Sequence, residues 1–326
     1  MFTRKDIDSR SVFVINCFDN DRSLRLRNGE LLLAEQRENK EVTLTKFPFQ
    51  KILMLFVIGN ITITTPLIEK CQKFAVALVV TKINLRPVFI FASSAEGNFL
   101  LRQRQYDFPK DDVSIAKVLV KNKILNQRAA LSLSRKKDDK TTKAIKFCEN
   151  AIKYLANTND YHRLMGIEGA ASKVFFAAYF QHTEWSGRYP RTKCDAMNTV
   201  LDIGYTMLFN FMECIVRLFG FDVYVGVYHR LWFKRKSLIC DLIEPFRCII
   251  DHATLLAFNR KQFSEKDFEK QKQEYRLKRE KAPEYYKVFC NNIIEHKTEI
   301  FVYVQQYYRC FMRQQNTDNY PKYLFK

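Results

Sequence analysis

The spacing of apolar residues changes once along the chain, near Pro109. Between residues 11 and 101, short runs rich in Val, Ile, Thr and Phe alternate with turn residues, a pattern typical of strands. The runs are SVFVINCF, LLLAE, VTLTKF, ILMLFVIG, ITITT, VALVVT and PVFIFAS. They predict a small sandwich or barrel-like sheet, interrupted by one helix from Pro66 to Phe74 with Thr65 as its cap.

Beyond Pro109, apolar residues recur three and four positions apart, which predicts helices. The predicted long helices cover residues 111–133, 140–157, 160–180 and 194–220, the last ended by Gly220. We interpret the charged stretch 264–286 as a solvated helix face, followed by an aromatic helix and an irregular tail. The sequence therefore predicts an α+β protein. A β-rich, sandwich-like domain covers residues 1–105, and a larger all-α domain covers residues 106–326.

Composition narrows the class of partner. The chain carries 54 Lys and Arg against 35 Asp and Glu, a formal net charge of +19. This charge favours a polyanion as the binding partner: nucleic acid is the first candidate and an acidic membrane surface the second. The nine cysteines form no C-x-x-C pair, so neither a disulfide framework nor a zinc ribbon is indicated. Because the longest unbroken apolar run, 52–59, is too short to cross a bilayer, we expect a cytoplasmic protein with no membrane partner.

One carboxylate stands out because of its neighbours. Glu168 lies in GIEGAASKVFFAAYF, residues 166–180, a segment with the composition of a buried helix. An unpaired buried charge is costly, so a helix end, a salt bridge or a solvated face is the simplest explanation of a lone Glu. A functional role requires chemical partners elsewhere in the chain.

Such partners occur near residue 240. Asp241 and Glu244 are three positions apart, hence on one side of a helical turn, and Pro245 places them near a helix start. A capping arrangement explains this pair in structural terms, and a lone His is usually structural too. His229, however, precedes Asp241 by twelve residues. Imidazole and carboxylate ligands together suit Mn²⁺ or Mg²⁺ with open positions for phosphate and water.

Two basic clusters accompany these residues. Arg230, Lys234, Arg235 and Lys236 follow His229, and a second cluster lies in the connector that precedes residue 194. Clustered cations suit the phosphates of DNA, although many surface loops are basic without a function.

Three ordered blocks together resemble the CRISPR-associated adaptation integrases, the Cas-one family. RLMGIEGAASKVFF is similar to the first metal-ligand helix of that family, and RYPRTKCDAMNTVLDIGYTML to its R-x-P…D-x-x-N-x-x-L-x-x-G-Y-x-x-L block. VGVYHRLWFKRKSLICDLIEPFR resembles its His loop followed by D-L-x-E-x-F-R, and GNITITTPLIEKC and KILNQRAAL also agree. The resemblance implies that Glu168, His229 and Glu244 hold Mg²⁺ or Mn²⁺, with Asp241 as an auxiliary ligand or a supporting group. Without the ion, these carboxyls should repel, and one should have a raised pKa.

The resemblance also assigns roles to further residues. The motif positions are Asp195, Asn198 and Tyr205. We expect Asp195 to cap the helix that follows it. The DNA-contact candidates are Lys173, Arg188, Arg191, Lys193, Lys234, Arg235 and Arg247. Lys173 stands where the family often has Arg, and Lys lacks the bidentate fork of a guanidinium.

The implied activity is spacer acquisition in prokaryotic antiviral defence. A prespacer DNA 3′-hydroxyl attacks the leader–repeat boundary of a CRISPR array by metal-dependent transesterification, and branched DNA is cleaved in reverse. The implied partners are double-stranded DNA, a second copy paired through the β-rich domain, a Cas-two dimer that completes a hetero-hexamer and, in some systems, a Cas-four nuclease. Two alternatives remain open: a stand-alone metal-dependent DNA nuclease and a non-catalytic nucleic-acid-binding scaffold.

Overall fold

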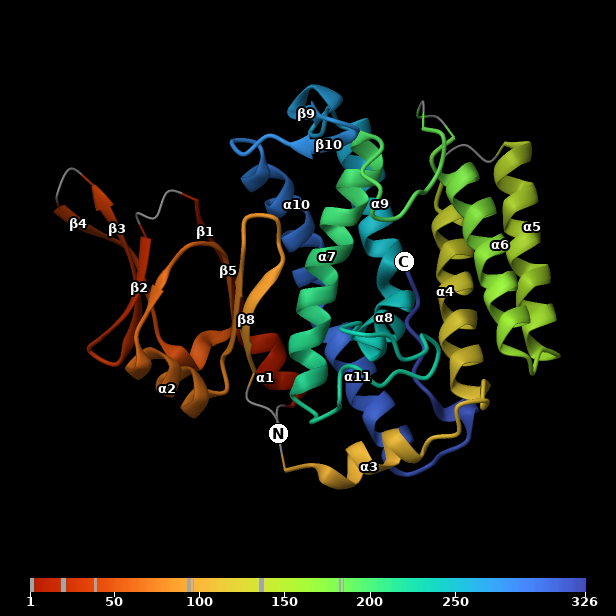
Figure 1. The fold of residues 1–326 in the computed structure, drawn as a ribbon, viewed down its shortest axis with the longest axis horizontal. Helices are drawn as coiled ribbons and strands as arrows, with labels where there is room; N and C mark the ends of the chain where they lie inside the picture. Colours follow the sequence, from red (N-terminus) through yellow and green to blue (C-terminus); the bar gives the residue numbers. More distant parts are fainter. Residues whose placement is uncertain are drawn as a thin grey trace. The chain divides into compact units, whose positions relative to one another are not determined.

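The chain forms two compact units (Figure 1). The computed structural model describes residues 3–18, 22–37, 40–92, 95, 97–134, 138–181, 183 and 185–326. The first unit comprises Met1–Asn98 and Glu213–Gly220, and the second comprises Phe99–Met212 and Phe221–Lys326. The predicted domain boundary at residue 105 falls inside helix α3 (Phe99–Asp107), seven residues beyond the division between the units.

The first unit contains a mixed four-stranded sheet with the order β1-β5-β7-β8. Its strands are β1 (Ser11–Cys17), β5 (Ile52–Gly59), β7 (Ala77–Thr81) and β8 (Pro87–Phe91). β5 pairs in parallel with both β1 and β7, and every residue of β5 is buried. A parallel strand covered on both faces has a continuous apolar sequence, which explains the run ILMLFVIG.

The second sheet of this unit has the order β4-β3-β2-β6. Its strands are β2 (Arg22–Arg27), β3 (Glu30–Arg37), β4 (Lys40–Phe47) and β6 (Thr62–Ile63). β2, with the sequence RSLRLR, is absent from the predicted strands because only Leu24 and Leu26 mark it as apolar. Asn28 and Gly29 both have positive φ values, 51° and 80°, as a two-residue hairpin turn requires.

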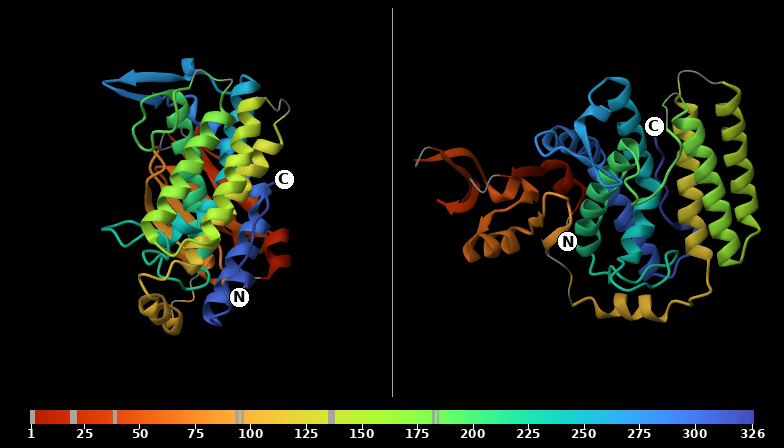
Figure 2. Two further views of the ribbon diagram at one scale, coloured as in Figure 1. Left: turned by 90° about the vertical axis from the view of Figure 1, so that its right-hand side faces the viewer. Right: turned by 45° about the horizontal axis from the view of Figure 1, so that its top comes forward.

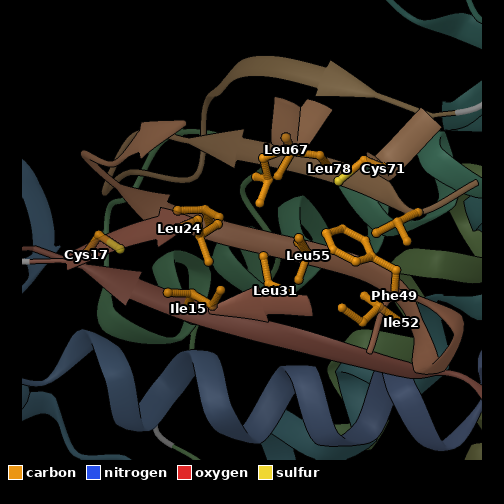
Figure 3. Packing of buried hydrophobic residues seen from close by; sticks show 12 residues of the cluster. Ile15, Cys17, Leu24, Leu31, Phe49, Ile52, Leu55, Leu67, Cys71 and Leu78 are labelled. Atoms are coloured by element: carbon orange, nitrogen blue, oxygen red, sulfur yellow. The ribbon is translucent and has the colours of Figure 1, made fainter. Parts of the chain in front are cut away.

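Both sheets and helix α2 (Thr65–Phe74) share one apolar core (Figure 3). Leu24 and Leu31 come from one sheet, Leu55 and Leu78 from the other. The unit also contains α1 (Arg4–Ser9) and the short helix η1 (Phe49–Lys51). The prediction of Thr65 as helix cap is wrong by one position, since the residue at the N-cap of α2 is Thr64.

The second unit is helical, which confirms the α+β class. Its helices are α3, α4 (Ser114–Ser132), α5 (Asp139–Ala156), α6 (Tyr161–Tyr179), α7 (Ala196–Arg217, whose end belongs to the first unit), α8 (Ser237–Ile243), η2 (Glu244–Phe246), α9 (Arg247–Asn259), α10 (Ala282–Glu295), α11 (Lys297–Met312) and η4 (Thr317–Asn319). α4, α5 and α6 lie side by side (Figure 2). Within the described residues, α7 alone is long and apolar enough to cross a membrane, and 78% of its most apolar window is buried in the protein.

The charged stretch 264–286 corrects the all-α prediction. It forms η3 (Glu265–Asp267) and a hairpin of β9 (Phe268–Gln271) and β10 (Glu274–Leu277), and only its end belongs to α10. Lys272 turns the hairpin with a φ of 58°. The stretch has no apolar face at helical spacing, so nothing would bury it as a helix. The predicted aromatic helix also divides at His296 into α10 and α11.

Candidate metal and nucleic-acid site

Three elements of the second unit bring two carboxylates onto one ammonium group. Lys123 of α4 forms an ion pair with Glu168 of α6, and its Nζ lies 2.6 Å from Oε2 of Glu244 in η2. Oε1 of Glu168 also accepts a hydrogen bond from the Ser172 hydroxyl at 2.9 Å. Burial alone would lower the pKa of Lys123, but the two carboxylates raise it above its usual value. The group therefore stays charged.

Glu244 is an ionised, buried carboxylate. Its side chain is 4% exposed, and Oε1 lies 3.1 Å from Nε of Arg247. Burial alone would raise the pKa of Glu244, but Arg247, Lys123 and His229 outweigh burial and hold it at about 2. The expected rise in pKa does not occur at Glu244, because the nearby positive groups compensate the charge of its carboxylate.

The contacts of Glu244 are close but poorly directed. Within the described chain, neither Oε2 of Glu244 nor Nε of Arg247 has a hydrogen bond of acceptable geometry, although both take part in ion pairs. The carboxylate is thus held mainly by charge, with the Lys123 ammonium 2.6 Å from Oε2. Such an oxygen is suited to accept a cation.

Asp241 fixes the orientation of His229. Its two carboxylate oxygens accept the backbone N–H groups of Val227, Tyr228 and His229 at 2.7, 3.0 and 2.8 Å, and the Nδ1–H of His229 at 2.7 Å. Four donors occupy the fully buried carboxylate, so Nε2 is the ring nitrogen available to a ligand. The sequence predicted that Asp241 is either an auxiliary metal ligand or a supporting group. This geometry favours the role of a supporting group.

Sequence reasoning missed the contribution of α4. Asn126 donates to the Pro245 carbonyl at 2.8 Å, next to Glu244, and Gln127 donates to the Ser172 hydroxyl at 3.2 Å, next to Glu168. The sequence offered one signal, the agreement of KILNQRAAL with the family that the chain resembles. The structure adds that its Lys, Asn and Gln are buried polar residues of one helix. In so basic a chain, Lys123 is indistinguishable by sequence from a solvated lysine.

The tail of the chain completes the anchoring of α4. Asn122 donates to the carbonyl of Tyr323 at 2.6 Å and accepts from its N–H at 2.9 Å. Asn126 accepts from the N–H of Phe325 at 3.0 Å. The tail is irregular from residue 320 onward, as predicted, but its start forms η4, and Tyr323 and Phe325 are buried.

The motif residues of α7 form a second buried network. Asp195 caps the helix, as predicted, by accepting the N–H of Asn198 at 2.6 Å. Asn198 also accepts from the N–H of Tyr189 at 2.8 Å and so fixes the preceding connector. Tyr205 donates to Asp251, whose burial raises its pKa to about 7 despite this hydrogen bond and nearby cations.

The predicted DNA contacts separate into internal and exposed groups. Arg188 pairs with Asp202 at 2.5 Å, and Arg247 lies 4.6 Å from the centre of the Tyr205 ring as well as against Glu244. Both guanidinium groups are therefore engaged inside the protein. The candidates that reach solvent are Lys173, Arg191, Lys193, Lys234 and Arg235.

The interpretation of α6 as a buried helix holds for the side of Glu168, which also carries the buried Leu164, Ala171 and Phe175, but it is wrong for the opposite side. Gly166, Gly169 and Ala170 are exposed, and a Cβ atom added at either glycine would meet nothing within 4 Å. Glu168 itself retains 19% of its side-chain exposure. Small residues thus leave one side of α6 open, and this side differs from the one that carries Glu168.

The donor set fits a divalent cation. In the structure itself, no three side chains of His, Cys, Asp or Glu among the described residues lie close enough together to hold an ion. The Lys123 ammonium instead lies where Glu168 and Glu244 converge, so the protein already places positive charge there. The oriented imidazole of His229 and the carboxylates of Glu168 and Glu244 are N and O donors of the chemical type that suits Mg²⁺ or Mn²⁺.

The protein thus has a β-rich unit followed by a helical unit, and the helical unit contains a charge-compensated acidic centre. The family model "CRISPR associated protein Cas1" matches residues 15–290, and the chain belongs to this family, the Cas-one family of the sequence resemblance.

Named relatives agree with this membership. The chain is 29% identical over 254 residues to "CRISPR-associated endonuclease Cas1 1" of Thermodesulfovibrio yellowstonii, covering 74% of this chain and 79% of that protein. It is 26% identical over 332 residues to a "CRISPR-associated exonuclease Cas4/endonuclease Cas1 fusion" of Leptospira interrogans, covering 93% of this chain and 59% of the fusion.

Solved structures share the fold. A Cas1 protein from Thermotoga maritima superposes with a TM-score of 0.74 at 17% identity, covering 96% of this chain and 98% of that chain. A "Casposase bound to integration product" gives 0.77 at 18% identity, with coverage of 96% and 94%. A chain of a "Cas6-RT-Cas1--Cas2 complex" gives 0.76 at 19% identity, with coverage of 97% and 36%.

Proposed function

We propose that this protein is a CRISPR adaptation integrase that joins prespacer DNA 3′-hydroxyl ends to the leader–repeat boundary. The observation that carries the proposal is the convergence of Glu168 and Glu244 on one positive group, in the unit where Asp241 orients His229. Membership of the Cas1 family supports it, as does the shared fold of a casposase whose structure holds an integration product.

The proposed chemistry is a balanced exchange of phosphodiester bonds. Glu168, His229 and Glu244 would hold the Mg²⁺ or Mn²⁺ ion, which when bound polarises the phosphoryl oxygen and lowers the pKa of the attacking hydroxyl. The 3′-oxygen forms one P–O bond as another P–O bond breaks, and the proton passes from the attacking to the leaving oxygen. One such bond replaces another, so the same centre also runs disintegration and cleavage of branched DNA.

The residues around the centre have separate tasks in this proposal. Asp241 holds the His229 ring through Nδ1, and Arg247 keeps Glu244 ionised. The exposed cations of the second unit bind DNA phosphates and position both strands by charge.

The proposed assembly is that of a prokaryotic cytoplasmic defence complex. We propose a homodimer paired through the β-rich unit, two such dimers bridged by a Cas2 dimer, and a Cas4 nuclease as assistant in some systems. The names "Cas6-RT-Cas1--Cas2 complex" and "Cas4/endonuclease Cas1 fusion" of similar proteins support these partners.

An integration assay tests the activity. Purified protein, with and without Cas2, receives a labelled duplex with free 3′-hydroxyls and a supercoiled plasmid with a CRISPR repeat, in Mg²⁺, Mn²⁺ or chelator. We expect metal-dependent transfer of label that is lost in Glu168→Gln. Glu149→Gln is the matched control, because Glu149 is a half-exposed carboxylate of α5 paired only loosely with Arg128 at 3.6 Å.

Other outcomes separate the alternatives. Nicking without joining supports a stand-alone nuclease. DNA binding without chemistry, even with Cas2 present, supports a scaffold and overturns the metal-site assignment. Thermal unfolding of both variants shows whether a loss of activity is only a loss of fold.

A further inference from the structure

One oxygen of the Glu168 carboxylate takes all of its donors. Oε1 accepts hydrogen bonds from the ammonium of Lys123 and, at 2.9 Å, from the hydroxyl of Ser172. Among the described residues, no group donates to Oε2. Because the side chain keeps 19% of its exposure, the carboxylate is fixed at one oxygen and leaves the other available to a ligand.

Lys123 alone does not set this orientation. Its ammonium is a compact charge on a flexible stem, with donors that rotate, and it pairs with Glu244 as well as with Glu168. Either oxygen of Glu168 would satisfy it. The Ser172 hydroxyl is different, because it lies on the same helix as Glu168, one turn further along, and has a single proton to donate.

Gln127 of α4 fixes the direction in which Ser172 donates. Its Nε2–H donates to the Ser172 oxygen at 3.2 Å, so the hydroxyl accepts from α4 and donates to Glu168. A serine inside a helix commonly bonds the carbonyl four residues earlier, but the hydroxyl of Ser172 bonds the side chain of that residue instead. The serine is therefore held between two helices with its proton on Glu168.

The contact between Gln127 and Ser172 is made at a cost in stability. Gln127 is 2% exposed, and its Oε1 has no hydrogen-bond partner among the described residues. A buried carbonyl oxygen without a donor is destabilising. Local costs of this kind are typical of functional sites, and this one lies beside a proposed metal ligand.

We propose that Ser172 is a positioning residue for the cation site. Its hydroxyl holds Oε1 of Glu168, so that Oε2 is presented to a divalent cation, and Gln127 aligns the hydroxyl. Hydrogen bonds to ligating groups tune metal affinity in this way, as Asp241 does for the His229 ring. This inference rests on the proposed function for the identity of the ligand, but binding of the cation can be measured without DNA.

Mn²⁺ binding to the whole chain tests the positioning directly. Electron paramagnetic resonance measures free Mn²⁺ during a titration without DNA, and Glu168→Gln identifies the binding that belongs to this site. We expect Ser172→Ala to weaken the Kd for Mn²⁺ about tenfold. Urea unfolding of each variant in chelator shows that the fold is kept.

Further variants separate positioning from packing. Ser172→Thr keeps the hydroxyl and should restore the wild-type Kd. Gln127→Leu should weaken Mn²⁺ binding without lowering the stability of the metal-free protein, because it removes both the alignment and the unpartnered oxygen. Ser132→Ala is the matched control and should leave the Kd unchanged. The Ser132 hydroxyl also bonds a residue four positions earlier, the carbonyl of Arg128 at 2.9 Å, but at the end of α4.

Three results overturn the proposal. They are an equal Kd in Ser172→Ala and wild type, a loss that Ser172→Thr does not restore, and unfolding of Ser172→Ala in chelator, which assigns the serine to packing.

The same proteins separate this inference from the proposed function. If the Kd for Mn²⁺ depends on Ser172 and wild type never joins DNA, the integrase proposal fails and the positioning role remains. If wild type joins DNA and Ser172→Ala binds Mn²⁺ as wild type does, the reverse holds. If wild type binds no Mn²⁺, both fail.

Discussion

The ammonium group of Lys123 compensates two carboxylates from two other elements. With 11% exposure, it is too buried for water to replace it. The ammonium therefore offsets the repulsion between Glu168 and Glu244 before any metal binds. Removal of one member of a buried ion pair leaves an uncompensated charge, which costs far more than the pair contributed.

Lys123→Met should destabilise the metal-free protein by about 3 kcal/mol. Mn²⁺ should recover most of this loss, because a divalent ion can supply the missing positive charge. Urea unfolding of wild type and variant, each with Mn²⁺ and with chelator, measures both effects. The same Mn²⁺ stabilisation in both proteins would contradict the shared position of ammonium and metal.

Asp251 makes stability depend on pH. Burial raises its pKa from 3.8 to about 7, so the folded state binds the proton more tightly than the unfolded state. The stability from this group is complete below about pH 4 and is lost as pH rises through about 7. Asp251→Asn does not titrate, and it should gain about 2–3 kcal/mol relative to wild type between about pH 5 and pH 8. Urea unfolding at both pH values tests this, and a difference independent of pH would refute it.

Helix α6 and the turn before His229 use glycine for opposite reasons. A methyl group at Gly169 would enter open space, whereas one at Gly226 would meet Oδ2 of Asp241 at 2.5 Å. Gly169 leaves one side of helix α6 without a side chain. The second lets the backbone close around the carboxylate that orients His229.

Gly169→Ala should stabilise the protein by about 0.5–1 kcal/mol, because glycine is unfavourable inside a helix. Joining should be unchanged, because the methyl group enters open space on a different side of α6 from Glu168. Gly226→Ala is the contrasting variant, and it should lose both stability and joining. Unfolding curves and the integration assay measure both quantities, and a loss of joining by a fully folded Gly169→Ala would contradict this placement.

The elements show which features a sequence can reveal. Periodicity predicted α4, α5, α6 and α7, because each has an apolar face. It failed for β9 and β10, where charged residues dominate and only Phe268 is buried. Motif resemblance pointed to Glu168, His229 and Glu244, but the partners of a charge depend on packing. The internal pairing of Arg188 and the compensating role of Lys123 therefore required coordinates.

Across the whole molecule, the net charge of +19 is divided between internal and solvated cations. Only the solvated ones can release counterions from DNA, so the salt dependence of binding counts them. Lys234→Ala should lower the slope of log K against log salt by about 1. Arg188→Ala should leave the slope unchanged and lower stability, because Asp202 and Asn198 lose their partner. Fluorescence anisotropy over a salt series measures the slopes, and equal effects of the two variants would contradict the division.

The bonds between α4 and the tail also set an order of assembly during synthesis. Asn122 and Tyr323 are 201 residues apart, and Asn126 and Phe325 are 199 apart. At translation rates of about 5–20 residues per second, α4 leaves the ribosome roughly 10–40 seconds before its partners exist. Until then, two asparagines beside the carboxylate centre lack their final acceptors and donors. The nascent protein therefore completes the anchoring of α4 only after Phe325 has been synthesised, when the β-rich unit has had time to fold.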